Sequence, residues 1–192
     1  MFNHLFILFI ACTTTDIKDS AAPQQEEFDF STVEMGVQHT VDCAQYFNYT
    51  ACDLILKDQN DEYFRLYDHI GKVIILDFST GWCGPCQIVA ATVQETQDLY
   101  NEQDFLYVTV LIEDNEGIPT TEQYASQWAE TYNITTAPVL QGSRHLIDYD
   151  AIEGYNLTGW PTFYVINRNM EIVSGLRGFN EEWLTERIEE NL

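Results

Sequence analysis

An apolar run near the middle of the chain, VIILDF at positions 73–78, is interrupted only by Asp77. A continuous run of this kind is typical of a strand buried on both faces of a sheet, because a half-exposed strand would alternate. Residues 104–114, DFLYVTVLIED, form a second such run. Between the two, residues 87–102 carry apolar side chains at helical spacing, so the pattern predicts strand, helix, strand.

Further strands are predicted on either side of this unit. Upstream, residues 54–56 and 63–66 are separated by turn-forming residues at 58–61, which indicates a β-hairpin. Downstream, residues 136–142 predict a short strand, and residues 159–176 predict two strands joined by a turn.

Two more helices are predicted in the second half of the chain from their N-terminal signals. Thr120 and Gln123 form a capping-box pattern. Asn180 is placed to cap the last helix. The whole order, β-β, β-α-β-α, β-β-α, predicts an α/β fold in which helices flank a central mixed β-sheet, with an N-terminal β-hairpin extension.

The beginning of the chain has a different character. Residues 1–11, MFNHLFILFIA, are too short an apolar segment to span a bilayer and predict a signal peptide. Residues 12–35 are polar and acidic, which predicts a flexible tether. Residues 36–192 are then expected to form the folded domain.

Cys12 follows directly on this apolar segment. The sequence FIAC resembles the cleavage site of a bacterial lipoprotein signal, in which the cysteine becomes lipidated; the alternative is a plain signal peptide with an incidental cysteine. Lipidation would leave two pairs among the five cysteines of an exported protein. It would anchor the chain on the periplasmic side of a bacterial membrane. Thr13, in the place of a retention aspartate, favours the outer membrane.

The net charge of −23, from 31 acidic and eight basic residues, excludes some partners. An electrostatic field of this sign repels phosphate backbones and anionic lipid surfaces. We therefore expect no nucleic-acid partner, and membrane contact only through the N-terminal lipid.

Cys83 and Cys86 follow the central apolar run with two residues between them, and three kinds of chemistry would use such a pair. A structural metal site needs about four ligands, and the histidines are scattered along the sequence, so no metal site is expected. A purely structural bridge would close too small a loop to stabilise the fold much. Redox exchange explains the placement best, because a helix N-terminus favours the thiolate form of Cys83.

The motif WCGPC, preceded by LDF, resembles thioredoxin. The upstream hairpin and the long segment after the motif look more like the exported TlpA/ResA-like thiol–disulfide oxidoreductases. This resemblance implies a thioredoxin-like fold, an attacking cysteine at Cys83 and a resolving cysteine at Cys86. It also implies that Asp77 takes the proton from Cys86; the alternative for Asp77 is a hydrogen-bonded structural acid.

The segment GWPTF carries the resemblance further. It implies a cis peptide bond before Pro161, with Trp160 beside the docked substrate. Trp82, Gly84 and Pro85 would complete the docking surface. The Gly-Pro pair between the cysteines is that of reducing thioredoxins, and residues there tune the stability of dithiol against disulfide.

Cys43 and Cys52 form the remaining pair. The main interpretation is a structural disulfide that fastens the N-terminal extension. A second redox relay is the alternative.

These patterns together predict an exported, lipid-anchored thiol–disulfide oxidoreductase that reduces protein disulfides. Its partners would be protein disulfides and thiols and a recycling reductant, either soluble or membrane-bound, and no cofactor is expected beyond the redox-active pair. The resemblance also allows a role in cytochrome c biogenesis. The alternatives are an oxidant of the same fold and a non-catalytic binding module.

Overall fold

The computed structural model describes residues 28–192. Contacts divide the chain into Met1–Ser31 and Thr32–Leu192. Only residues 28–31 of the first unit are described, so the predicted signal peptide, Cys12 and most of the predicted tether lie outside the described residues. Within the part described, no helix is long and apolar enough to cross a membrane.

The centre of the second unit is a mixed five-stranded sheet with the order β6-β5-β4-β7-β8. Its strands are β4 (Val73–Thr80), β5 (Phe105–Glu113), β6 (Val139–Gln141), β7 (Thr162–Ile166) and β8 (Ile172–Arg177). β4 runs parallel to β5 and antiparallel to β7. Every residue of β4 and β5 is buried, as the continuous apolar runs predicted.

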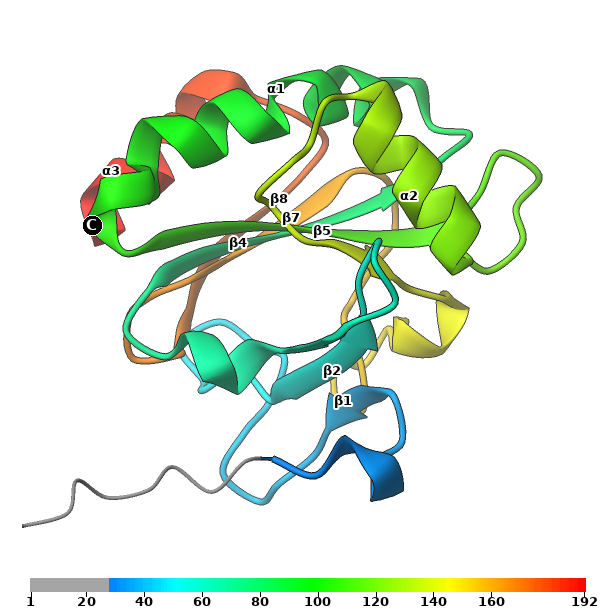
Figure 1. Cartoon of the computed structure of the whole chain (residues 1–192). Coiled ribbons are helices and arrows are strands. Elements are labelled where there is room, and N and C mark those ends of the chain that lie inside the picture. Colours follow the sequence, from blue (N-terminus) through cyan, green and yellow to red (C-terminus); the bar gives the residue numbers. More distant parts are fainter. Residues whose placement is uncertain (1–27) are drawn as a thin grey trace, which may run out of the picture. The chain divides into compact units, whose positions relative to one another are not determined.

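One face of this sheet is covered by helices (Figure 1). They are α1 (Gly84–Tyr100), α2 (Glu122–Thr131) and α3 (Glu181–Asn191). Their buried side chains form one apolar cluster with Val73 and Ile75 of β4. Alternate residues of β4 therefore face the helices, and Asp77 belongs to this set by its position in the strand.

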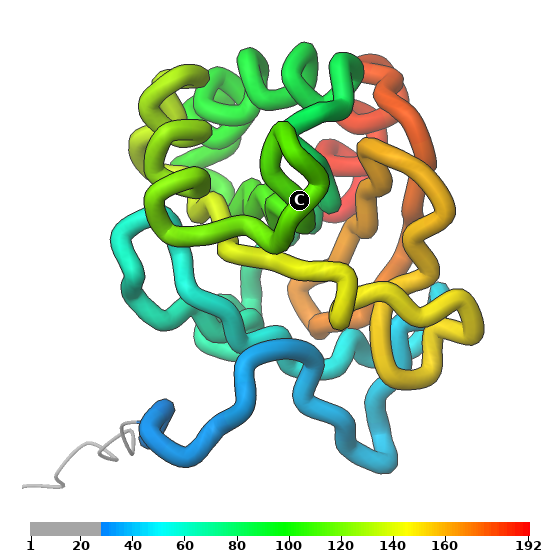
Figure 2. Tube along the Cα trace, turned by 90° about the vertical axis from the view of Figure 1, so that its right-hand side faces the viewer, coloured from blue at the N-terminus to red at the C-terminus, as the bar shows by residue number. Residues whose placement is uncertain are grey.

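A small three-stranded sheet covers the other face (Figures 1 and 2). It consists of β1 (Gly36–Gln38), β2 (Asp53–Lys57) and β3 (Tyr63–Arg65) in the order β1-β2-β3. Leu54 and Phe64 pack with Leu76 and Phe78 of β4 in a second cluster. The predicted hairpin is confirmed, whereas β1, which has no apolar pattern, was not predicted.

The described residues also contain the 3-10 turns η1 (Phe30–Thr32), η2 (Leu66–His69), η3 (Asn101–Gln103) and η4 (Arg144–Leu146). The mixed sheet with helices and an N-terminal hairpin is the predicted thioredoxin-like architecture.

The helix starts show how well local signals locate an element. Asn180 accepts a hydrogen bond from the backbone N–H of Trp183, as predicted. The N-cap predicted at Thr120 was wrong by one residue. Thr121 is the N-cap of α2, and its side chain accepts the backbone N–H of Tyr124 at 3.3 Å. Thr120 is buried instead, which removes it from the helix end.

Candidate active site

Cys83 and Cys86 are joined by a disulfide where β4 passes into α1. The turn between them and the strand is tight. Gly81 donates its N–H to the carbonyl of Glu113 at 2.7 Å, and a Cβ at Gly81 would collide with the Tyr124 hydroxyl. The end of β4 and the end of β5 therefore fix the position of the redox pair.

The two sulfur atoms have different surroundings. Cys83 is the N-cap of α1, and its Sγ accepts the backbone N–H of Cys86 at 3.2 Å. Cys83 is 6% exposed, whereas Cys86 is completely buried. The helix N-terminus stabilises negative charge at Cys83, so Cys83 is the sulfur suited to attack and Cys86 the one suited to resolve.

Asp77 is a carboxylic acid buried among apolar side chains, only 1% exposed. Its Oδ1 accepts a hydrogen bond from Ser79 at 2.7 Å, and its Oδ2 accepts one from Tyr107 at 3.3 Å. Burial raises the pKa of Asp77 to about 7, against the opposing effect of these two hydrogen bonds. Burial also raises the pKa of Tyr107, so that phenol remains a donor. Asp77 can therefore exchange a proton near neutral pH.

Asp77 and Cys86 lie on surfaces that face each other. Cys86 is on the buried side of α1 together with Val89, Ala90 and Val93, which share one helical face. That side packs on the face of β4 to which Asp77 belongs. The arrangement suits proton transfer between the buried acid and the resolving thiol.

Glu113 is a site residue that the sequence analysis missed. Its side chain is 4% exposed at the end of β5. One carboxylate oxygen accepts the Trp82 indole N–H at 2.9 Å, and the other accepts the Nε–H of Arg144. Glu113 thus holds the half-exposed Trp82 beside Cys83. Its place at the end of a buried strand was the only signal in the sequence.

The Trp160–Pro161 peptide bond is cis, as the resemblance implied. The Pro161 carbonyl accepts the N–H of Gly178 at 2.8 Å, which ties the loop to β8. Thr162, next in sequence, pairs with Phe78 of β4. This register places the loop beside the strand that leads to Cys83.

Three of the predicted docking residues adjoin the cysteines in sequence. Trp82, Gly84 and Pro85 are exposed. Trp82 and Trp160 line one pocket of about 400 Å³, together with Arg144, Ile147, Tyr149, Leu157, Thr158 and Gly159. The lining combines aromatic and aliphatic side chains with the Arg144 guanidinium.

The other predicted site residues lie elsewhere. Cys43 and Cys52 form a disulfide, and Cys52 directly precedes β2 of the small sheet. That sheet lies across the large sheet from α1 (Figure 1). Cys12 is outside the described residues.

Comparison with known proteins agrees with this geometry. The model of the AhpC/TSA family matches residues 48–174. The chain belongs to the AhpC/TSA family. The thiol-disulfide oxidoreductase ResA of Geobacillus kaustophilus is 27% identical over 129 residues, 67% of this chain and 68% of ResA. The thioredoxin-like protein YneN of Bacillus subtilis is 27% identical over 139 residues, 72% of this chain and 71% of YneN.

Solved structures share the fold. A thiol:disulfide interchange protein DsbE, described as putative, from Chlorobium tepidum superimposes with a TM-score of 0.58 at 21% identity, over 82% of this chain and 99% of that protein. The exposed lipoprotein thioredoxin Etrx1 of Streptococcus pneumoniae gives a TM-score of 0.53 at 23% identity, over 72% and 98%. This AhpC/TSA member is therefore a thiol–disulfide oxidoreductase with a thioredoxin-like fold.

We predict that Asp77→Asn stabilises the protein above neutral pH. The folded pKa of about 7 lies above the ordinary 3.8, so the folded state alone holds the proton between these values. The wild type thus loses stability as pH rises through this window, by about 2–4 kcal/mol in total, and an uncharged amide avoids the loss. Urea unfolding at about pH 4 and about pH 8 should show a gain mainly at the higher pH. Glu95→Gln, at an exposed position of α1, is the control; an equal gain from Asp77→Asn at both pH values would contradict the prediction.

We predict that Glu113→Ala impairs the use of protein substrates more than it changes the thiol itself. The substitution removes the acceptor of both Trp82 and Arg144, and losing one charge-assisted hydrogen bond costs about 1.5–3 kcal/mol. We expect kcat/KM for a protein disulfide to fall about tenfold or more, with the alkylation rate of Cys83 unchanged. Glu113→Gln keeps one acceptor oxygen and should lose less. Equal kcat/KM in all three proteins would show that Trp82 needs no such support.

Proposed function

We propose that the chain is an exported, lipid-anchored reductase of protein disulfides that works through the Cys83–Cys86 dithiol. The observation that carries the proposal is the sulfur of Cys83 at the N-terminus of α1, where it accepts the N–H of Cys86. Cys83 is 6% exposed, whereas Cys86 is completely buried, and the surroundings of Cys83 favour the thiolate that attacks disulfides.

The reaction balances as two consecutive exchanges. The Cys83 thiolate attacks one sulfur of a substrate disulfide, a mixed disulfide forms, and the other substrate sulfur leaves as a thiolate. Asp77 takes the proton of Cys86, and the Cys86 thiolate then attacks Cys83. The second substrate sulfur leaves, and two electrons have passed from the dithiol to the substrate.

One feature supports the reducing direction, and a second supports exchange at neutral pH. Gly84 and Pro85 match the dipeptide of reducing thioredoxins, and both are exposed next to Cys83. Asp77, with a pKa of about 7, is a base matched to neutral pH. Each cycle leaves a disulfide, so a thiol reductant has to restore the dithiol.

Export and lipidation rest on the sequence at Cys12, which resembles a lipoprotein signal. Etrx1, which is described as an exposed lipoprotein thioredoxin, is a precedent for this fold in such a form.

The reduction potential of the Cys83–Cys86 pair tests the direction. Tryptophan fluorescence, chiefly from Trp82, can follow the pair in a thiol redox buffer. We expect a value near that of thioredoxin, about −270 mV, and insulin reduction that Cys83→Ser abolishes. A value near about −120 mV would identify an oxidant instead. A pair that does not equilibrate at all, with no insulin reduction, would favour the binding module.

The full chain and its Cys12→Ala variant, expressed in a bacterium, test the anchor. We expect metabolic labelling with palmitate and recovery in the membrane fraction for the wild type, and loss of both for the variant. Disulfide reductase activity in lysate should be equal, because Cys12 belongs to no described part of the active site. An unlabelled wild type would show that the segment is a plain signal peptide or none.

A further inference from the structure

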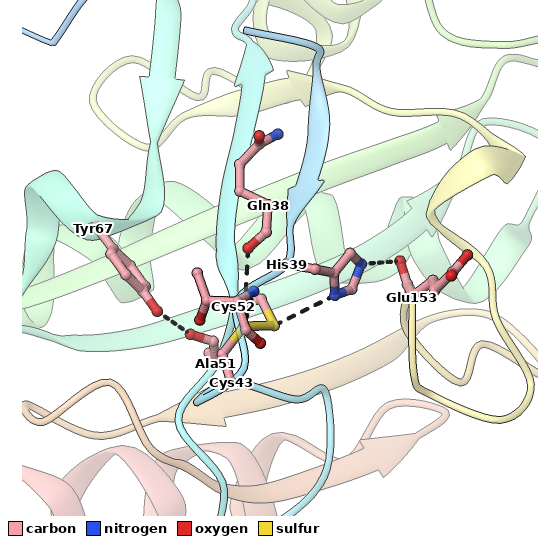
Figure 3. Close-up of a disulfide and its surroundings, with 8 residues drawn as sticks. Gln38, His39, Cys43, Ala51, Cys52, Tyr67 and Glu153 are labelled. Atoms are coloured by element: carbon pink, nitrogen blue, oxygen red, sulfur yellow. Dashed lines mark hydrogen bonds between the residues drawn. A yellow bond between two sulfur atoms is a disulfide. The ribbon is translucent and has the colours of Figure 1, made fainter.

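The second disulfide of the chain lies in a different layer from the active site. Cys43 lies in the loop that joins β1 to β2, and Cys52 directly precedes β2 (Figure 3). This layer covers the face of the large sheet opposite α1 (Figure 1). Nothing in the reaction of Cys83 uses the bridge, so its own chemistry has to be judged separately.

Its two sulfur atoms are not equivalent. Cys52 is completely buried, whereas Cys43 is half-buried in a loop of mostly exposed residues. The Cys43 sulfur accepts the backbone N–H of Thr40 at 3.3 Å. An external thiolate would reach Cys43 first. The backbone donor at that sulfur stabilises the negative charge that Cys43 takes later, when it leaves the mixed disulfide.

His39 lies against the buried sulfur. Its Nδ1 is 3.7 Å from Cys52 Sγ, and its Nε2 is 2.8 Å from the carbonyl oxygen of Glu153 (Figure 3). A carbonyl oxygen only accepts, so Nε2 carries a proton in either charge state of the ring. The nitrogen that gains and loses a proton is therefore Nδ1, which faces the sulfur.

Protons can reach His39 from solvent. The ring is exposed and lines a pocket of about 600 Å³. Glu34, Glu153 and His145 are the other charged or titratable residues that line this pocket. Asp148 is close enough to interact electrostatically with the imidazole. The pKa of Asp148 lies below its usual range, mainly because its carboxylate accepts backbone N–H groups, that of Glu153 first. The charge of His39 contributes more weakly.

We propose that Cys43–Cys52 is a second exchangeable disulfide, reduced by external protein dithiols, with His39 as the acid that protonates Cys52. The attacking thiolate forms a new S–S bond to Cys43 while the Cys43–Cys52 bond breaks. The electron pair goes to the Cys52 sulfur, which takes a proton from Nδ1 of His39. The second thiol of the dithiol loses its proton to solvent and displaces Cys43, which leaves as a thiolate and takes a proton from solvent. The dithiol ends as a disulfide, and the bridge ends as two thiols.

This arrangement has the same three parts as the active site. One sulfur can be reached, its partner is buried, and a proton-exchanging side chain serves the buried partner. A bridge whose only role is to fasten the loop needs no such group.

The test uses the full chain carrying Cys83→Ser and Cys86→Ser, so that its outcome is independent of the reductase proposal. Millimolar reduced glutathione serves as the probe, because a monothiol stops at the mixed disulfide. A chelator is present, so that trace metals do not catalyse oxidation of the thiols. Acid quenching, N-ethylmaleimide and peptide mass spectrometry then locate the label. We expect glutathione on Cys43 and maleimide on Cys52.

His39→Asn tests the acid, with His145→Asn as the matched control in the same pocket. We expect His39→Asn to slow glutathione attachment about tenfold or more, because general acid–base groups contribute at least that much, and His145→Asn to leave the rate unchanged. If His39 had only a structural role, the substitution would have the opposite effect on the rate, because loss of the ring would loosen the loop and speed glutathione attachment. Circular dichroism of each variant checks that the fold is retained.

Three results would overturn the proposal. They are a bridge that resists glutathione until the protein is unfolded, glutathione attached to Cys52 instead of Cys43, and a rate in His39→Asn equal to or above that of His145→Asn.

Discussion

The burial of β4 on both faces is the constraint on which the rest of the structure depends. A strand in this position has to pair with neighbours on both edges, and β4 does so with β5 and β7. Those pairings bring together the three parts of the active site: the turn that carries Cys83, the end of β5 with Glu113, and the loop with Pro161. The same burial sets the chemistry of Asp77, because no cation balances its charge among the groups that shift its pKa. The packing of β4 therefore both holds the sheet together and sets the pKa of Asp77.

The two faces of the sheet divide the chemistry of the chain. Helices cover one face, and the N-terminus of α1 supplies the electrostatic support for Cys83. The small sheet covers the other face, without a helix N-terminus at its disulfide. Instead, a backbone N–H donates to the Cys43 sulfur, and His39 lies against the Cys52 sulfur. The N-terminal extension thus completes the core and also carries a separate thiol pair with its own acid.

The sequence predicted best those features that are encoded by neighbouring residues. The buried strand around Asp77 and the pair at Cys83 could be located because their patterns are continuous. The start of α2 was misplaced by one residue, since tertiary burial of Thr120, invisible in a local pattern, decided between two threonines. Contacts between distant segments have no local pattern, and those that the resemblance did not imply were missed. Glu113 meets Trp82 across 31 positions, and His39 meets Cys52 across 13.

The acids that serve the two disulfides depend on the fold in different ways. The pKa of Asp77 is raised because the whole sheet and α1 exclude water from it, so any motion that admits water weakens its ability to hold a proton near neutral pH. His39 is exposed, and only one hydrogen bond, to the carbonyl of Glu153, orients its ring toward sulfur. Opening of the core would impair the Cys83–Cys86 pair first. A local change in the loop around Glu153 would affect only the Cys43–Cys52 pair, so the two pairs can respond to different disturbances of one fold.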